Sequence, residues 1–158
     1  MADWTTADLM DGDDTLGSCD TQLRIFGKRR RMAGEIATLS CFEDFVLLRD
    51  TLATPGRGRV LVVDGRGSLH RALLGDRMAA AALRNGWAGV VVNGAIRDVG
   101  TLGDIDLCIK ALGSNPRRGR QLGEGSAGEP VAFGGTVFRP GAYLYSDEDG
   151  IVVSANHP

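Results

Sequence analysis

Glycine residues that divide the sequence into short apolar runs place the tightest limit on its fold. The chain has 23 glycines among 158 residues, about twice the ~7% that is usual in proteins. They are spread between the apolar runs and form no low-complexity tract. Because glycine favours turns and interrupts regular structure, we expect many short strands and helices in a single compact domain that spans residues 1–158.

Composition and charge exclude several broad classes of protein. The chain is 43% hydrophobic and 24% charged, as ordinary globular domains are, and its net charge of −2 gives no general attraction for nucleic acid. No apolar run approaches the ~20 residues that cross a bilayer. The first ten residues carry acids, whereas a signal peptide is basic and then apolar. We therefore expect a cytoplasmic protein with no membrane partner.

The cysteines form no pattern of metal ligands or disulfides. Cys19, Cys41 and Cys108 are odd in number and widely spaced, without a CxxC pair. A nucleophilic cysteine would need a base, and the chain offers only His70 and His157 as histidines. We expect three reduced thiols.

Apolar periodicity predicts an α/β domain with an antiparallel C-terminal tail. Strands are expected at 35–40, 60–63, 90–92 and 107–112, and helices at 43–52 and 76–84. Asp76 would cap the second helix, and Gly86 would follow its end. The last third predicts antiparallel strands at 131–133, 137–139, 143–145 and 151–154, with turns at Gly134-Gly135 and at the DEDG run 147–150.

The segment from Arg59 to Asp98 predicts a βαβ unit. A right-handed crossover makes its two strands parallel, so the loop before the helix and the loop after the second strand open at the same edge of the sheet. Residues 75–78 and 93–98 should therefore face each other across one crevice, the usual place for a ligand in open α/β sheets. Gly94 would allow the chain to turn there, so that the adjacent Arg97 and Asp98 can serve one site.

The residues at this crevice suit a small anionic substrate and a cation. Gly75 lets the substrate approach the backbone N–H groups at the helix start, and Arg97 offers a planar fork of donors. Asp98 supplies one hard oxygen ligand, which is typical of Mg²⁺ or Mn²⁺ sites that take other oxygens from a substrate such as a 2-oxo acid. Asp76 could position a water molecule that donates or accepts a proton.

A plainer interpretation of the same residues stays open at this point. An Arg-Asp pair in a glycine loop is also common in solvated turns, and Asp76 alone is typical of a helix cap. The residues by themselves indicate a site and identify no substrate.

Four stretches of the sequence carry more specific motifs. They read VLVVDGRGSLHRALLGDRMAAAALRNGWAGVVVNGAIRDV at 60–99, CFED at 41–44, IKALGSNPR at 109–117 and FGGTVFRPGAYLYSDEDGIVV at 133–153. Together they resemble the RraA-like family over nearly the whole chain. That family combines class II 4-hydroxy-4-methyl-2-oxoglutarate aldolases with regulators of ribonuclease E activity.

The resemblance implies roles for individual residues. The aldolases of the family share an aspartate followed, after twenty residues, by an Arg-Asp pair, which Asp76, Arg97 and Asp98 match. It implies that Gly75, Asp76, Arg77 and Met78 bind substrate, that Arg97 binds substrate, and that Asp98 ligates a divalent cation, Mg²⁺ or Mn²⁺. Together with their placement at the crevice, this makes Arg97 and Asp76 the expected catalytic residues.

The resemblance also implies an activity, a fold and an assembly. The expected reaction is cleavage of 4-hydroxy-4-methyl-2-oxoglutarate to pyruvate, with oxaloacetate decarboxylase activity through the same pyruvate enolate. The expected fold is a β/β/α swivelling-type domain. The expected assembly is a homotrimer or a dimer of trimers.

Three positions depart from the family pattern. The family usually has Asn where Phe45 stands, and glycine where Lys28 and Arg66 stand. If Arg66 lines the crevice, it would alter the choice of substrate.

Two further functions compete with the lyase. A regulator that binds and inhibits a ribonuclease of the E type is the alternative, and the basic run from Lys28 to Arg31 is the feature that would favour it. Regulator-type members can lack the aspartate of the Arg-Asp pair, which this chain keeps as Asp98. A methyltransferase is disfavoured because its cofactor usually needs a larger doubly wound domain, and Gly65-Arg66-Gly67 is a weak sign of one.

Overall fold

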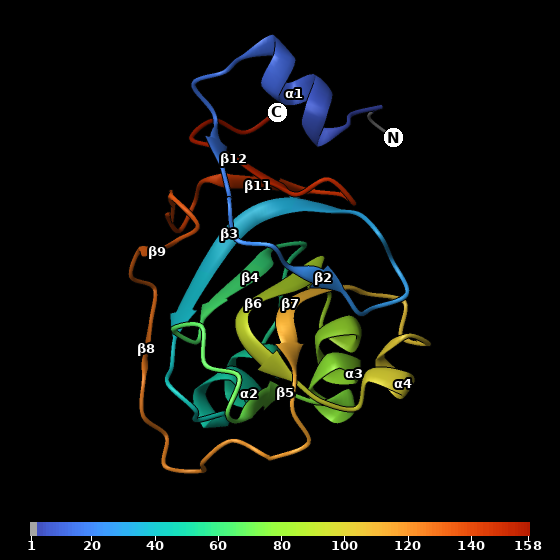
Figure 1. Ribbon diagram of the computed structural model, residues 1–158, viewed down its shortest axis with the longest axis vertical. Coiled ribbons are helices and arrows are strands. Elements are labelled where there is room, and N and C mark those ends of the chain that lie inside the picture. The colour runs from blue at the N-terminus through green and yellow to red at the C-terminus, as the bar shows by residue number, and fades with distance from the viewer. Residues whose placement is uncertain (1–2) are drawn as a thin grey trace.

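The computed structural model describes residues 3–158 as a mixed α/β fold built around one large sheet (Figure 1). Its helices are α1 (Thr6–Gly12), α2 (Val46–Leu52), α3 (Asp76–Arg84) and α4 (Val99–Leu102). Its strands are β1 (Gly17–Ser18), β2 (Arg24–Ile25), β3 (Met32–Ser40), β4 (Val60–Asp64), β5 (Ala72–Leu74), β6 (Gly89–Ile96), β7 (Cys108–Ser114), β8 (Ser126–Ala127), β9 (Val131–Phe133), β10 (Thr136–Phe138), β11 (Tyr143–Ser146) and β12 (Ile151–Ser154).

Parallel pairing holds the middle of the large sheet. The order of its main path is β1-β12-β11-β3-β4-β6-β7-β2, with β5 paired to β6 and β8 paired to β3. Strands β3, β4, β6 and β7 run parallel, and β11, β12 and β1 pair antiparallel at one end. The expected α/β fold, with a βαβ unit and an antiparallel C-terminal tail, is therefore confirmed.

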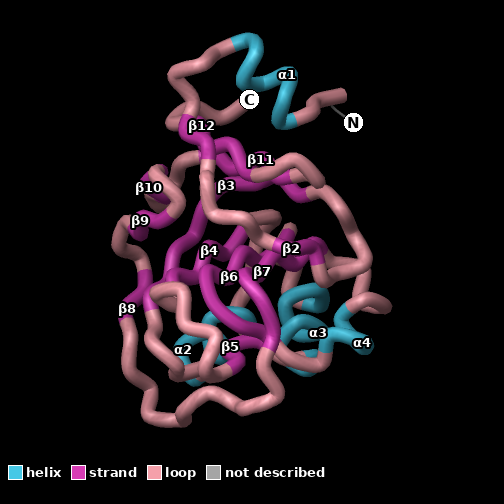
Figure 2. Tube along the Cα trace, viewed as in Figure 1, coloured by secondary structure: helices cyan, strands magenta, loops and turns pink. Residues whose placement is uncertain are grey.

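The apolar runs form strands because both faces of the sheet are covered. Residues 60–63 of β4 and all of β6 are buried, as expected for parallel strands packed on both sides. On one face, Leu48 of α2 and Ala79 of α3 lie in the larger hydrophobic cluster. On the other face, Phe138 and Leu144 of the antiparallel tail lie in a second cluster. Figure 2 shows α2, α3 and α4 gathered at the end of the molecule opposite α1.

The turns of the tail follow the sequence. Gly134 and Gly135, both at positive φ, connect β9 to β10, as a two-residue hairpin requires. The DEDG run connects β11 to β12, and its Asp147 backbone N–H donates to the Gly150 carbonyl at 3.1 Å. Both predicted turns are confirmed.

Two local details near the pocket differ from the sequence predictions. Helix α2 begins at Val46, and Glu43 adopts φ 55° before it, so the helix predicted from residue 43 starts too early. Strand β5 lies in the stretch expected to be a loop before α3.

In the part of the chain that the structure describes, no helix has the length and apolar character needed to cross a membrane.

Candidate functional site

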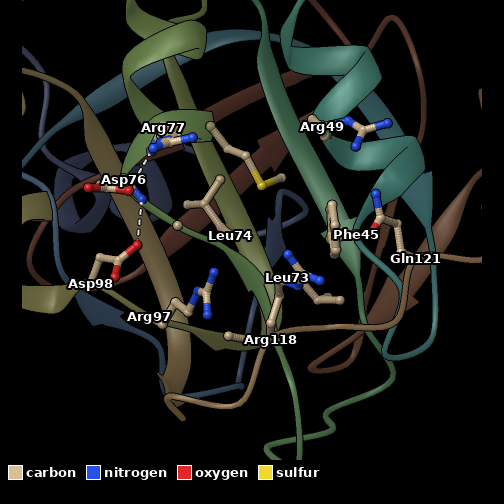
Figure 3. A pocket seen from close by; sticks show the side chains of 13 residues that line it. Phe45, Arg49, Leu73, Leu74, Asp76, Arg77, Arg97, Asp98, Arg118 and Gln121 are labelled. Carbon is tan, nitrogen blue, oxygen red and sulfur yellow. Dashed lines mark hydrogen bonds between the residues drawn. The ribbon is translucent and has the colours of Figure 1, made fainter.

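A pocket of about 570 Å³ lies where the βαβ unit opens. It is lined by Phe45, Arg49, Ala72, Leu73, Leu74, Gly75, Asp76, Arg77, Met78, Arg97, Asp98, Arg118 and Gln121. The predicted meeting of residues 75–78 with Arg97 in one pocket is confirmed. Figure 3 shows Asp76 and Asp98 on one side of the pocket, and Phe45, Arg49 and Gln121 on the other.

Strand β5 fixes the distance between the two loops. It pairs with the end of β6, with Leu74 opposite Ile96, and the Arg97 backbone N–H donates to the Leu74 carbonyl at 2.9 Å. Gly75 follows directly after Leu74, so it lies beside Arg97. Sequence reasoning missed this strand, although the short apolar run at 72–74 was a signal for it.

Asp98 closes the turn that brings its own side chain back to α3. It has φ 60° and ψ 37°, the left-handed conformation, and its Oδ2 accepts a hydrogen bond from the Asp76 backbone N–H at 3.0 Å. Gly94 was expected to make this turn, but it lies inside β6. The strand continues to Ile96, and the chain reverses at Asp98 instead.

The start of α3 is organised differently from the prediction. Gly75 is the N-cap, and no side chain caps the helix from that position, so the expectation that Asp76 is the cap is wrong. Asp76 is the first residue of α3, and its Oδ1 accepts from the Arg77 backbone N–H at 2.8 Å. The Asp98 carboxylate supplies the negative charge that a helix N-terminus favours.

Gly75 is required for this close approach. A Cβ at this position would lie 2.8 Å from Asp98 Oδ2 and 3.7 Å from Arg97 Nε. The backbone at Gly75 is extended, so space rather than strain explains the glycine. The absence of a side chain at Gly75 therefore lets the start of α3 pack directly against Arg97 and Asp98.

Positive charge dominates the pocket. Arg49, Arg77, Arg97 and Arg118 line it together with two carboxylates, Asp76 and Asp98. The Arg97 side chain is half-buried, and its Nη1 donates to the Pro116 carbonyl at 3.4 Å. Such a cavity favours small anions, because guanidinium groups match carboxylate oxygens in charge and geometry.

Of the three departures from the family pattern, Phe45 is the one that lines this pocket. Arg66 does not line it, and its guanidinium instead lies 5.9 Å from the centre of the Phe42 ring. The condition under which Arg66 would alter the choice of substrate is therefore not met. Lys28 also lies outside the pocket lining, in an exposed loop before β3.

Asp44 anchors the wall opposite α3, a role that sequence reasoning missed. Its buried carboxylate accepts backbone N–H groups of Val46, Leu122, Gly123 and Glu124 at 3.1, 2.9, 3.2 and 3.3 Å. Burial alone would raise the pKa of Asp44, but these hydrogen bonds outweigh it and hold the pKa below its usual value. The acidic pair in CFED was the available signal.

No cysteine lines the pocket. Cys19, Cys41 and Cys108 are free and buried. Burial raises the pKa of Cys41 to about 12 and that of Cys108 to about 11. A buried thiol with a raised pKa is a poor nucleophile, which agrees with the expectation of three reduced thiols.

The sequence profile of the RraA-like family, described as Aldolase/RraA, matches residues 6–153. The chain belongs to the RraA-like family. Among solved structures, this RraA-like chain is 42% identical to a protein of Geobacillus kaustophilus HTA426 named as an S-adenosylmethionine:2-dimethylmenaquinone methyltransferase, with a TM-score of 0.95 and coverage of 98% of this chain and 96% of that chain.

Two other similar structures carry names from RNA processing. The chain is 39% identical to the RNA-processing inhibitor RraA from Thermus thermophilis, with a TM-score of 0.96 over 99% of this chain and 96% of that one. It is 30% identical to Streptomyces coelicolor RraAS2, named as an unusual member of the RNase ES inhibitor family, with a TM-score of 0.71 over 86% and 71%. The family therefore includes proteins named as enzymes and proteins named as ribonuclease inhibitors.

The donors at the pocket fit a hard divalent cation. Among residues 3–158, no three His, Cys, Asp or Glu side chains gather as a metal site, so a fully protein-ligated transition metal does not fit. Asp98 is exposed and lines the pocket, and its Oδ2 accepts a hydrogen bond from the Asp76 backbone N–H. A single carboxylate at a pocket suits Mg²⁺ or Mn²⁺, which retain water and take their remaining oxygen ligands from other molecules.

Proposed function

We propose that this RraA-like chain is a divalent-metal-dependent aldolase that cleaves 4-hydroxy-4-methyl-2-oxoglutarate to pyruvate. It would also decarboxylate oxaloacetate, because both reactions pass through a pyruvate enolate. The observation that carries the proposal is the meeting of Arg97, Asp98 and the start of α3 in one cationic pocket. A 2-oxo acid fits there because its oxygens suit both an arginine fork and a cation.

Each residue at this end of the pocket has a role in the proposed reaction. The backbone N–H groups of Asp76 and Arg77 already donate to the carboxylates of Asp98 and Asp76. Within residues 75–78, the N–H groups of Gly75 and Met78 would therefore bind the substrate carboxylate at the positive end of the α3 dipole, and the Asp76 and Arg77 side chains would line its site. Arg97 would bind the substrate and stabilise the negative charge that develops on the keto oxygen. Asp98 would hold Mg²⁺ or Mn²⁺, and the cation, when bound, would add positive charge beside the same oxygen.

Asp76 is proposed to handle the proton. Its carboxylate lines the pocket next to Asp98 and is partly exposed to solvent. From there it would position a water molecule that donates a proton to the enolate or accepts one from the hydroxyl group of the substrate.

Release of pyruvate tests the proposal directly. We expect pyruvate from both 4-hydroxy-4-methyl-2-oxoglutarate and oxaloacetate in the presence of Mg²⁺, and background levels after a chelator is added. Activity that survives the chelator would contradict the role of the cation. An absence of pyruvate from both substrates would contradict the lyase.

Regulation of a ribonuclease is the second candidate function, because two of the similar structures are named as inhibitors of RNA processing or of RNase ES. The exposed basic residues from Lys28 to Arg31 would supply part of a contact surface. Inhibition of a purified ribonuclease of the E type by a chain that releases no pyruvate would favour this function.

We further propose that the chain assembles as a homotrimer or a dimer of trimers. Light scattering at micromolar concentration would measure the mass of the assembly.

Substitution of Gly75 by Ala tests the geometry around Asp98. The added methyl group would displace the Asp98 carboxylate, since its Cβ would lie 2.8 Å from Oδ2. We expect Mg²⁺ affinity to fall by roughly tenfold or more, as it does when groups that orient a metal ligand are changed. Titration calorimetry with Mg²⁺ measures the change.

Gly100→Ala is the matched control. Gly100 follows Asp98 by two residues, and nothing lies within 4 Å of its added Cβ. This variant should bind Mg²⁺ as the wild type does. Unchanged affinity in Gly75→Ala would show that the Asp98 position does not govern cation binding.

A further inference from the structure

Backbone hydrogen bonds hold the wall of the pocket opposite Asp98. Arg118 lies on an extended segment that is held on both sides. On one side the Gly119 backbone N–H donates to the Ala72 carbonyl at 2.9 Å, and on the other the Phe45 backbone N–H donates to the Arg120 carbonyl at 3.1 Å. Hydrogen bonds to Ala72 and Phe45 therefore fix the backbone next to Arg118.

Two guanidinium groups lie near one aromatic ring on this wall. The Cζ atoms of Arg49 and Arg118 are each 5.6 Å from the centre of the Phe45 ring, within the range of cation–π attraction. Arg49 also pairs with the exposed carboxylate of Asp50 at 3.0 Å. Arg118 takes part in none of the ion pairs found among residues 3–158.

The pocket has more positively charged side chains than one carboxylate group of a substrate would need. Arg97 and the start of α3 suffice for the 2-oxo acid end of a substrate, and Asp98 lies beside them. Arg118 then remains as a cation in the same cavity without a carboxylate partner. Its planar fork of donors suits a second carboxylate.

We propose that Arg118, supported by Arg49 and Phe45, binds the distal carboxylate of a dicarboxylic 2-oxo acid. The inference rests on the proposed function, because it assigns the Asp98 side of the pocket to the 2-oxo acid end. The apolar ring of Phe45, which is buried, would contact the carbon chain between the two carboxylates. The pocket would thus select dicarboxylates over monocarboxylates of the same length.

Binding of two unreactive acids tests this subsite. 2-Oxoglutarate and 2-oxopentanoate have the same chain length and differ by a terminal carboxylate in place of a methyl group. In calorimetry with Mg²⁺ present, wild type should bind 2-oxoglutarate about tenfold to 100-fold more tightly, the range expected of a charged hydrogen-bonded contact. Arg118→Met should lose this preference, and Arg118→Lys should retain part of it.

Arg120→Met is the matched control. It removes the same charge two residues away, from an exposed side chain outside the pocket lining, and it should keep the preference. Thermal melting of Arg118→Met and Arg120→Met shows whether both proteins are folded. A preference that survives in folded Arg118→Met, or that is absent from wild type, overturns the subsite.

The kinetics separate this inference from the proposed lyase. Arg118→Met should raise KM for 4-hydroxy-4-methyl-2-oxoglutarate by about tenfold or more, as the loss of a charged contact to the bound substrate does. If wild type releases no pyruvate but prefers 2-oxoglutarate through Arg118, the subsite stands and the lyase fails. If it releases pyruvate without that preference, the lyase stands and the subsite fails.

Discussion

Asp98→Asn is expected to slow pyruvate release roughly 100-fold to 1000-fold. The amide oxygen is a neutral and weaker ligand for Mg²⁺ than the carboxylate. The developing enolate charge would then lose about 3 to 4 kcal/mol of stabilisation, at 1.36 kcal/mol for each tenfold in rate. Steady-state decarboxylation of oxaloacetate at saturating Mg²⁺ measures the loss.

The fold should tolerate this substitution. Asp98 is exposed and has φ 60°, a conformation that asparagine adopts readily. The amide oxygen can still accept the Asp76 backbone N–H, so stability should change by no more than about 0.5 kcal/mol. Thermal melting checks this.

Asp104→Asn is the control for Asp98→Asn. Asp104 is exposed and lies outside the pocket lining. The Asp104→Asn variant should therefore release pyruvate at the wild-type rate. Equal rates in Asp98→Asn and wild type, from equally stable proteins, would remove Asp98 from the mechanism. The ribonuclease regulator would then become the better proposal.

The sequence predicted the part of the site that follows from the topology of one βαβ unit. The wholly apolar runs at 60–63 and 90–92 predicted buried strands, and a right-handed crossover then places both loops at one edge of the sheet. No side-chain contact was needed for that step. The structure confirms it, since residues 75–78 and Arg97 line one pocket.

Details inside the unit depended on contacts that periodicity does not record. Strand β5 has three residues, too few to show an alternating pattern, yet it sets Gly75 beside Arg97. The left-handed turn at Asp98 was assigned to Gly94, because glycine is the residue that most often makes such turns. Ala95 and Ile96 pair with β5 and β7, so β6 continues past Gly94, where its register with β7 shifts.

The opposite wall of the pocket could not be predicted from local sequence. Arg49 and Arg118 are far apart in the chain, and both lie near the Phe45 ring because the segment that carries Arg118 pairs beside Ala72. The acidic pair before α2 was interpreted as a helix start, since acids favour that position. Asp44 does accept the Val46 backbone N–H at the start of α2, but its other partners are the backbone N–H groups of residues 122–124.

Asp44→Asn is expected to lower the free energy of unfolding by about 2 to 4 kcal/mol at pH 7, because charged hydrogen bonds to a buried group are lost. One of the two Asn side-chain positions would place an NH₂ group against backbone N–H donors of residues 122–124. The segment that carries Gln121 and follows Arg118 would loosen as well. Urea unfolding of wild type and variant measures the difference.

The stability that Asp44 supplies should depend on pH. Its pKa in the folded protein is lowered, through backbone hydrogen bonds that outweigh the effect of burial, from about 3.9 in the unfolded chain. The contribution is therefore fully present above the unfolded pKa and is lost as pH falls through the folded pKa. The difference in free energy of unfolding between wild type and Asp44→Asn should be constant near neutral pH and should narrow below about pH 4.

Asp50→Asn supplies the comparison for this prediction. Asp50 is exposed and pairs with Arg49 at the surface, so its loss should change stability by about 0.5 kcal/mol or less. Equal stability of Asp44→Asn and Asp50→Asn at pH 7 would contradict the anchoring role. A stability difference that stays constant from pH 7 down to about pH 3 would contradict the lowered pKa of folded Asp44. Below about pH 4 the unfolded carboxylate takes up a proton while the folded one stays ionised, and this must narrow the difference.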